Sequence, residues 1–207
     1  MRLVVPQGAE ARAVLRAVSD AIVVPPGAAA ANALPEFAPG ERVVVVGLCG
    51  ALWRLRAGDV AIYARVVDGA HAFAIDPDRV DEVAAALPGA HVVNACTTRR
   101  VVTAVDARHV LAQRFNADVV DMEGTHLAAA LAERGVPFAM VRVVSDDASR
   151  NLPAIEDAVD PEGKLRPLKI AEAFVRAPRA ATAFVRDVRR SLATLTETAR
   201  ALSGIAV

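Results

Sequence analysis

The chain has 207 residues, of which 54% are hydrophobic, 23% charged and 4% aromatic, and its 24 basic and 24 acidic residues give a formal net charge of zero. The apolar fraction is too high and the net charge too low for a disordered chain. No basic excess is present to neutralise phosphates, which argues against a nucleic-acid partner. The length fits a single domain that spans residues 1–207.

The chain lacks the features of metal-binding, exported and membrane-spanning proteins. Cys49 and Cys96 are too few for a disulfide framework, and no Cys-x-x-Cys or His-x-x-x-His spacing indicates a zinc site. The longest uncharged apolar run, residues 43–53, is well short of the ~20 residues that a spanning helix needs. The apolar start at residues 1–6 is too short for a signal peptide. We therefore expect a cytoplasmic protein with no metal and no membrane partner.

Apolar runs and helical periodicities alternate along the chain. In the first half we expect a strand at residues 2–5, a helix at 8–19, a strand at 22–24, a short helix at 28–34, and strands at 42–47 and 60–67. In the second half we expect a helix at 78–87, strands at 91–95 and 100–103, a helix at 106–115, a strand at 119–122, a helix at 124–134 and a strand at 137–144; a polar loop at 145–153 and helices at 167–176 and 178–202 follow. This alternation predicts an α/β domain with a central mixed β-sheet flanked by helices.

Polar and glycine residues gather at four predicted strand ends, which is where ligands bind in such sheets. These ends are Gly-Ala-Glu at 8–10, Gly-Leu-Cys-Gly at 47–50, Asp-Met-Glu at 121–123 and Arg-Val-Val-Ser-Asp at 142–146. A single acidic residue at a strand end is often only a helix cap. Four such groups at corresponding ends of one sheet indicate a functional site.

Two of these strand ends carry family-like motifs. Val-Val-Asp-Met-Glu-Gly at 119–124, a helix, and Val-Pro-Phe through Arg to Ser-Asp at 136–146 resemble the nucleoside phosphorylase/nucleosidase superfamily, which includes purine nucleoside phosphorylases and methylthioadenosine/adenosylhomocysteine nucleosidases. The glycine loop at 47–52 and Gly-Asp-Val at 58–60 are similar to a second family segment. The tail at 151–178, with Pro-Glu-Gly-Lys at 161–164, more loosely resembles a bacterial subgroup of phosphorylase-like proteins associated with hopanoid synthesis.

The resemblance implies cleavage of the N-glycosidic bond of a purine nucleoside or a 5′-modified adenosine. It places Glu123 on the ribose hydroxyls, as a charge-assisted acceptor, and Met122 against the sugar face. Asp146, held by Ser145, would be the general acid toward purine N7, a task that needs a raised pKa. Glu10 would be the general base that activates water.

The resemblance also implies which residues surround the substrate. The glycine loop contributes Gly47, Cys49 and Gly50 as substrate-binding residues. The family often has an aromatic residue that stacks on the base near residue 100, and here Val101 or Val102 takes that place. Family members need no metal or organic cofactor, and their neighbours in a homodimer or a higher homo-oligomer often complete the site.

Three sequence features bear on the choice between hydrolysis and phosphorolysis of the same substrates. Leu48 stands where the family usually has Ser, and residues 43–46 lack the Arg that phosphorylases tend to place before the glycine loop. These departures favour water as the nucleophile. Gly8 and Arg12 are spaced as in the phosphate-binding loop of bacterial phosphorylases, so phosphorolysis with phosphate as co-substrate is the alternative.

Other readings stay open. Arg142 on an apolar strand is expected to form a structural ion pair with a carboxylate, because an unpaired buried charge is costly. Cys49 at the end of a strand resembles a nucleophile elbow, with four histidines as candidate partners: His71, His91, His109 and His126. The family's hairpin before the valine-rich strand is missing from residues 19–46, and residues 68–90 are short, so a nucleoside-binding protein without turnover is a third reading.

Overall fold

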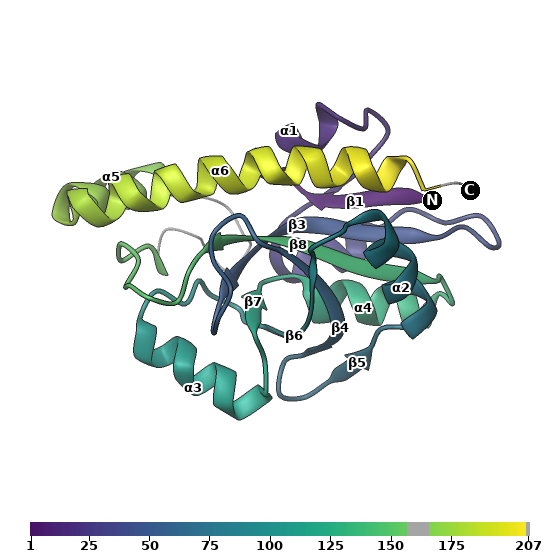
Figure 1. Ribbon diagram of the computed structural model, residues 1–207, viewed down its shortest axis with the longest axis horizontal. Helices are drawn as coiled ribbons and strands as arrows, with labels where there is room; N and C mark the ends of the chain where they lie inside the picture. Colours follow the sequence, from purple (N-terminus) through teal and green to yellow (C-terminus); the bar gives the residue numbers. More distant parts are fainter. Residues whose placement is uncertain (157–165, 206–207) are drawn as a thin grey trace.

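The computed structural model describes residues 1–156 and 166–205, arranged as one sheet system with helices around it (Figure 1). The strands are β1 (Arg2–Pro6), β2 (Ile22–Val24), β3 (Val43–Ala51), β4 (Val60–Val67), β5 (Ala72–Ala74), β6 (His91–Thr97), β7 (Val119–Asp121) and β8 (Phe138–Asp146). The helices are α1 (Ala9–Leu15), the 3₁₀ helix η1 (Gly27–Ala33), α2 (Pro77–Ala86), α3 (Val105–Phe115), α4 (Gly124–Glu133), α5 (Pro167–Arg176) and α6 (Pro178–Ser203). The segment 161–164, which carried part of the looser resemblance, lies outside the described residues.

The sheet is mixed, as the sequence predicts. β1 pairs in parallel with β2 and β3, β3 with β8, β4 with β6, and β6 with β7. β3 pairs antiparallel with β7, and β4 pairs antiparallel with β5 and β8. Because β8 joins β3 to β4, the strands β3, β7, β6, β4 and β8 form a closed ring of pairings, and β1 and β2 extend it on one side. The ring brings the ends of β3, β7 and β8 together.

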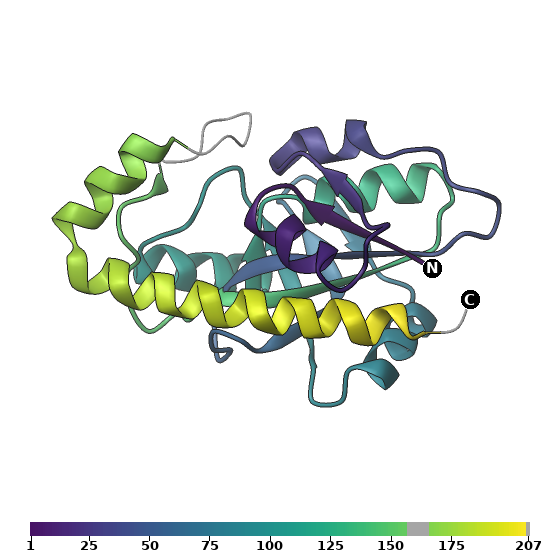
Figure 2. The same cartoon turned by 90° about the horizontal axis from the view of Figure 1, so that it is seen from above.

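Helices cover the sheet on more than one side. α6 is a long helix that packs along β8, β3 and α1, and Figures 1 and 2 show it running the length of the molecule. α4 packs against η1 and against β4, β5 and β6. The valine run at 43–46 in β3 is buried on both faces, as expected for a strand between layers. These buried strands support the loops that follow them.

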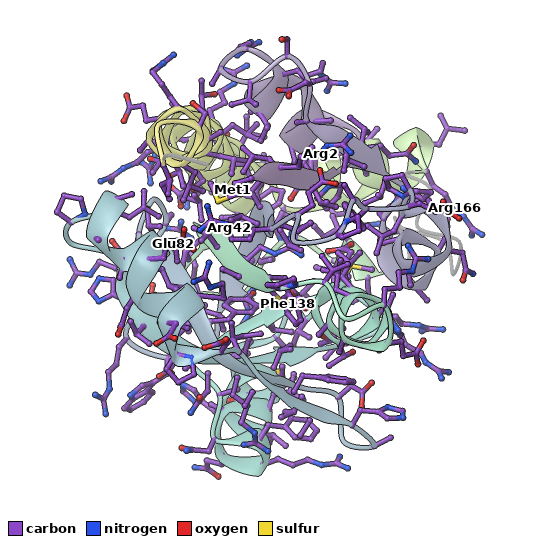
Figure 3. All side chains as sticks on the ribbon, turned by 90° about the vertical axis from the view of Figure 1, so that its right-hand side faces the viewer. Met1, Arg2, Arg42, Glu82, Phe138 and Arg166 are labelled. Carbon is purple, nitrogen blue, oxygen red and sulfur yellow. The ribbon has the colours of Figure 1, made fainter. Side chains whose placement is uncertain are left out.

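The amino ends of β3 and β8 are fastened by charged side chains. Val43 of β3 pairs with Phe138 of β8. Next to it, the Nη1 atom of Arg42 lies 2.5 Å from Oε1 of Glu82, and the Nη1 atom of Arg79 lies 2.5 Å from Oε2 of the same carboxylate. Figure 3 shows Arg42 and Glu82 at this edge, with Phe138 below them. These contacts hold α2 to the end of the sheet that is remote from the glycine loop.

The structure corrects one predicted strand and adds another. Residues 100–103 form no strand but a loop between β6 and α3, because β6 already pairs with β4 on one side and β7 on the other. Val101 of this loop packs against an apolar cluster formed by Ile155 and by Ala173 of α5. β5 was not expected from the sequence. α1 ends at Leu15, earlier than the predicted residue 19.

Candidate active site

One cavity of about 170 Å³ lies where the ends of β3, β7 and β8 meet the loop before α3. Many of the residues singled out in the sequence line it: Glu10, Cys49, Gly50, Val101, Val102, Met122, Glu123, Ser145 and Asp146. Leu48, Asp121 and Arg108 line it as well. The ring of strand pairings therefore brings together side chains that are more than a hundred residues apart in the chain.

Three of the sequence candidates lie outside the lining of this cavity. Gly8, in the turn before α1, and Arg12, on α1 itself, are both exposed. Gly47 is buried in β3 opposite Arg142 of β8, and a Cβ atom at this position would collide with the Arg142 guanidinium. The structural contribution of Gly47 is thus the space that admits the arginine.

A β-bulge positions the Ser-Asp motif of β8. Cys49 pairs with Val144 and Gly50 with Asp146, so Ser145 is the extra residue on β8. The Ser145 Oγ atom lies 3.0 Å from the Cys49 carbonyl oxygen and 2.5 Å from Oδ1 of Asp146. The bulge therefore ties the carboxyl group of Asp146 to the end of β3.

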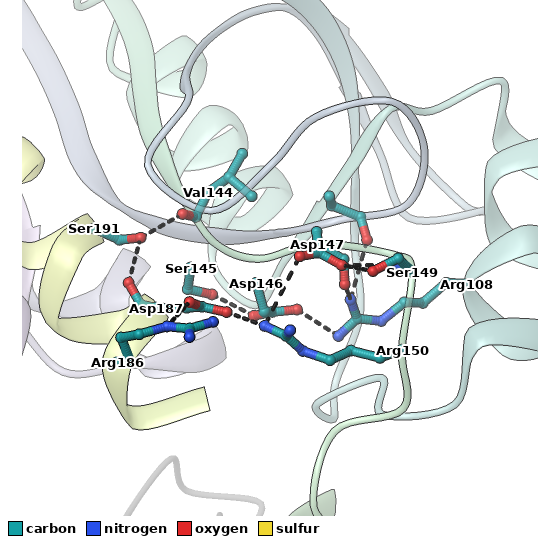
Figure 4. A network of polar contacts seen from close by, with 11 residues as sticks. Arg108, Val144, Ser145, Asp146, Asp147, Ser149, Arg150, Arg186, Asp187 and Ser191 are labelled. Carbon is teal, nitrogen blue, oxygen red and sulfur yellow. Dashed lines mark hydrogen bonds and ion pairs between the residues drawn. The ribbon is translucent and has the colours of Figure 1, made fainter. Parts of the chain in front are cut away.

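Asp146 is also paired with a buried arginine that the sequence analysis did not single out. The Nη2 atom of Arg108 lies 2.5 Å from Oδ2 of Asp146, and both residues are nearly inaccessible, at 1% and 5% exposure. Figure 4 shows Asp146 between Ser145 and Arg108. Burial raises the pKa of the Asp146 carboxyl, while Arg108 and the hydrogen bond from Ser145 act in the opposite direction.

A second charged group surrounds Arg142, which is fully buried. Its Nη2 atom lies 3.6 Å from Oδ2 of Asp121 and 3.6 Å from Oε2 of Glu123, which confirms the expected ion pair with a carboxylate. The Thr97 hydroxyl donates to Oδ1 of Asp121 at 2.7 Å, and the Tyr63 hydroxyl donates to Oδ2 at 3.2 Å. Asp121 is thereby committed to protein contacts.

Glu123 lines the cavity and has a protein partner at each carboxylate oxygen. Its Oε1 atom accepts the backbone N–H of Gly27 at 2.8 Å, where η1 begins. Burial raises the pKa of Glu123, and Arg142 opposes this by favouring the charged form. Met122, directly before it, is half-buried and lines the cavity.

Glu10 reaches the cavity from α1. Its Oε1 atom accepts the backbone N–H of Leu48 at 2.6 Å, so the main chain of β3, which extends through the predicted glycine loop, holds the carboxylate whatever side chain Leu48 carries. Burial, and then the negative charge of Glu123, raise the pKa of Glu10 to about 7, against the opposing charge of Arg142. A carboxyl group with this pKa changes its protonation near neutral pH.

The arrangement around Cys49 does not suit thiol catalysis. Burial raises the pKa of its thiol far above the ordinary value, and a reactive cysteine needs the thiolate. No histidine is among the described residues that line the cavity. The Cys49 side chain is hydrogen-bonded to Tyr63. Cys49 is therefore a buried thiol in the wall of the site.

Sequence reasoning missed Arg108, and it placed Asp121 at a candidate strand end without giving it a role of its own. Arg108 is the only described residue of α3 that is buried, and a helix with mostly exposed positions gives no periodic signal for one inward-facing arginine. Asp121 ends a buried apolar strand just before the Met-Glu pair. An acidic residue inside such a run was the available signal for it, because buried charges are usually paired.

Within residues 1–156 and 166–205, no group of three or more histidine, cysteine, aspartate or glutamate side chains is arranged to hold a metal ion. None of the described helices combines the length and the apolar character needed to cross a bilayer.

Comparison with known proteins places this chain in a family. The sequence profile of the Phosphorylase superfamily matches residues 24–176. This chain therefore belongs to the phosphorylase superfamily. No curated protein sequence matches it.

Solved structures with the same fold include named nucleosidases and hydrolases. A methylthioadenosine/adenosylhomocysteine nucleosidase of Helicobacter pylori superimposes with a TM-score of 0.71 at 13% identity, covering 98% of this chain and 97% of that chain. A futalosine hydrolase of the same organism gives 0.70 at 13% identity, with the same coverage of 98% and 97%. A structure described as a methylthioadenosine nucleosidase of Weissella paramesenteroides gives 0.63 at 18% identity, covering 97% and 99%. At these identities the likeness is one of fold.

Proposed function

We propose that this chain hydrolyses the N-glycosidic bond of a purine nucleoside or a 5′-modified adenosine and releases the free base. The observation that carries the proposal is the convergence of Glu10, the Met122–Glu123 pair and the Ser145–Asp146 pair on one cavity. Membership of the phosphorylase superfamily supports it. The structures with the same fold are named as nucleosidases and as a hydrolase, which supports water as the nucleophile.

The leaving base needs a proton, and Asp146 is the residue placed to supply it. As the C1′–N9 bond breaks, its electron pair stays with the base and the Asp146 carboxyl transfers its proton to N7, so the base departs neutral. Burial favours the protonated carboxyl before the reaction. The Ser145 hydroxyl, at 2.5 Å from Oδ1, holds the carboxyl in one orientation.

The sugar and the water need a second set of groups. Glu123 would accept hydrogen bonds from the ribose hydroxyls, and Met122 would pack against the sugar. The water oxygen bonds to C1′, and Glu10 takes the proton that the water loses. A base with a pKa of about 7 is suited to this task at neutral pH, because it is partly ionised and still basic. Proton exchange with solvent then restores Glu10 and Asp146.

Charge at the site favours hydrolysis over phosphorolysis. Glu10, Asp121 and Glu123 surround Arg142, whose positive charge is already shared among these carboxylates. A phosphate ion next to them would meet electrostatic repulsion. Arg12, the candidate phosphate ligand, is exposed on α1 and does not line the cavity.

The decisive experiment measures free-base release by chromatography. Purine nucleosides and 5′-modified adenosines are incubated with the protein, with and without inorganic phosphate. Release that does not depend on phosphate supports the hydrolase. Release that requires phosphate makes the protein a phosphorylase and directs attention to Gly8 and Arg12.

Replacing Asp146 with Asn tests the residue that protonates the base. We expect turnover to fall by roughly a hundredfold or more, the usual contribution of a positioned general acid, with the far-UV circular dichroism unchanged. Asp106→Asn, on the exposed face of α3, is the matched control and should keep full activity. An unchanged rate in Asp146→Asn would remove Asp146 from the mechanism.

A binding protein without turnover is the second candidate. The cavity of about 170 Å³ is smaller than the roughly 300–1,000 Å³ of common ligand sites, which favours a small or incomplete pocket in one subunit. A rise in melting temperature with adenine, without base release from any nucleoside, would support this candidate. Any measurable enzymatic release of base would exclude it.

The assembly and surroundings that go with the hydrolase are part of the proposal. We expect a homodimer or a higher homo-oligomer, in the cytoplasm, acting without a metal or an organic cofactor. Sedimentation velocity of the purified protein measures the assembly, and activity after dialysis against a chelator tests the metal independence.

A further inference from the structure

Arg108 is an unusual residue for α3, a helix that otherwise faces solvent or lies at intermediate depth. It is the one buried residue of this helix, at 1% exposure. Placing a guanidinium group away from water is costly unless it is paired and hydrogen-bonded. The contacts of Arg108 therefore show which interactions offset the free-energy cost of burying its charge.

The guanidinium group joins three separate segments that surround the cavity. Its Nε–H donates to the carbonyl oxygen of Val102 at 3.0 Å. Its Nη1 group donates to the carbonyl oxygens of Ala51, at 3.3 Å, and Asp147, at 3.0 Å. These acceptors belong to the loop before α3, the end of β3 and the loop after β8. The guanidinium group cannot rotate without breaking all three hydrogen bonds.

With Nε and Nη1 held in this way, Nη2 is aimed at Asp146, where it lies 2.5 Å from Oδ2. The other carboxyl oxygen, Oδ1, is 2.5 Å from the Ser145 hydroxyl. Each oxygen of Asp146 thus has its own polar partner. Ser145 belongs to the family-like motif at 136–146, whereas Arg108 lies outside it.

We infer that Arg108 is a positioning residue that fixes the carboxyl group of Asp146 and sets how strongly this group holds its proton. The inference rests on the proposed function, in which Asp146 gives a proton to the leaving base. When that proton moves to N7, a carboxylate is left in a buried site. Arg108 stabilises this carboxylate at the moment it forms, which makes Asp146 a stronger acid.

Other charged groups near Asp146 act less directly. The Cys49 thiol of β3 is neutral because burial raises its pKa far above the ordinary value. The negative charge of Asp147, next in the chain, raises the pKa of Asp146 slightly. Arg150 is paired with Asp187 of α6, as Figure 4 shows, and lies 3.8 Å from Asp147, so its charge is offset. Arg108 is the cation in direct contact with Asp146.

The direction of the effect on the reaction follows from this geometry. A positive charge beside a carboxylate favours the ionised form and lowers its pKa, by about one to three units for an arginine in contact. Removing the charge raises the pKa of Asp146. If Asp146 works in its protonated form, the alkaline limb of the kcat/KM profile then moves to higher pH, while kcat falls because a weaker acid transfers its proton less readily.

The test compares pH–rate profiles of the wild type, Arg108→Met and Arg108→Lys, with Arg114→Met on the exposed face of the same helix as control. We expect the alkaline limb of Arg108→Met to move up by about one pH unit or more, with kcat at least tenfold lower. Arg108→Lys keeps the charge but loses the three carbonyl contacts, so its limb should stay within a few tenths of a unit of the wild type. Arg114→Met should match the wild type throughout.

Two results would overturn the inference. One is an Arg108→Met enzyme that is folded and active with the limb of the wild type. The other is an equal loss of rate in the Met and Lys variants with no movement of any limb, which would make Arg108 a purely structural clamp. A wild type that releases no base contradicts the proposed function instead.

A measurement without turnover keeps the inference testable in that last case. Unfolding of Arg108→Met, Asp146→Asn and the double variant is compared with the wild type at pH 5 and pH 8. We expect Arg108→Met to lose more stability at pH 8, where an unpaired buried carboxylate remains, and the added Asp146→Asn to remove this difference. Additive effects that are independent of pH would contradict the inference.

Discussion

At the scale of single residues, Asp146, Glu123 and Glu10, three of the four acidic residues that line the cavity, differ in their surroundings. Asp146 contacts Arg108 directly, whereas Glu123 lies 3.6 Å from Arg142 and accepts the backbone N–H groups of Gly27 and Met122. Glu10 accepts one backbone N–H and faces the negative charge of Glu123. Glu10 therefore has the weakest support for its charged form, which fits a group that must take up a proton. Environments of this kind separate acid and base roles between carboxyl groups.

The raised pKa of Glu10 makes a prediction about stability. Its pKa is about 7 in the folded protein against 4.5 for an unperturbed glutamate, so the folded state binds this proton more tightly than the unfolded state. The contribution is complete below pH 4.5 and is lost as the pH rises through 7. We expect the wild type to lose roughly 2–3 kcal/mol of unfolding free energy from this group between pH 5 and pH 8.

Glu10→Gln removes the titrating group and keeps an oxygen for the Leu48 N–H. Urea unfolding at both pH values should show that this variant loses less stability than the wild type as the pH rises. Its rate of base release should fall at every pH, because an amide cannot take the proton of the water. Equal pH dependence of stability in the two proteins would mean that burial does not raise the pKa of Glu10.

At the scale of elements, the apolar runs and helical periodicities predict most strands and helices, because each depends on nearby residues. The loop at 100–103 was wrongly predicted as a strand. Its Val101 packs in an apolar cluster that includes Ala173 of α5, and its Val102 packs in another cluster that includes Leu52. The sequence pattern cannot reveal partners that far along the chain. The Met-Glu and Ser-Asp motifs predict residues that line the cavity. Arg108 was not predictable, because its partners come from β3 and β8 across the ring.

The pairing of β3 with β8 makes a prediction at Gly47. This glycine is opposite Arg142 in the parallel register, and a methyl group there would collide with a guanidinium that is fully buried between Asp121 and Glu123. Because neither the arginine nor the strand has room to move, we expect Gly47→Ala to cost roughly 1–3 kcal/mol of stability. Urea unfolding measures the loss.

Gly204→Ala, at the end of α6, is the control for that substitution. Its nearest neighbour would be the Ala201 carbonyl oxygen at an ordinary contact distance of 3.4 Å. We expect it to change stability by no more than a few tenths of a kcal/mol. A Gly47→Ala protein as stable as this control would show that Arg142 is free to shift.

At the scale of the whole molecule, the closed ring of β3, β7, β6, β4 and β8 joins the first and second halves of the sequence. β8 is the last described strand along the chain, and it pairs with both β3 and β4. The C-terminal helix α6 packs on β3 and α1. The two halves of the described chain therefore share one main hydrophobic core, and neither half has a separate core of its own. The ring also explains why residues from α1, β7 and β8 meet in one cavity.

This topology predicts that the protein unfolds in a single step. Trp53 is the only tryptophan and follows β3, so its fluorescence reports on the ring, whereas far-UV circular dichroism is dominated by helices such as α6. If the 207 residues form one domain, urea should give coincident transitions by both probes, since α6 cannot stay folded without β3 and β8. Separate midpoints would show that the helical end of the chain is an independent unit. The site would then depend on the docking of two units rather than on one cooperative core.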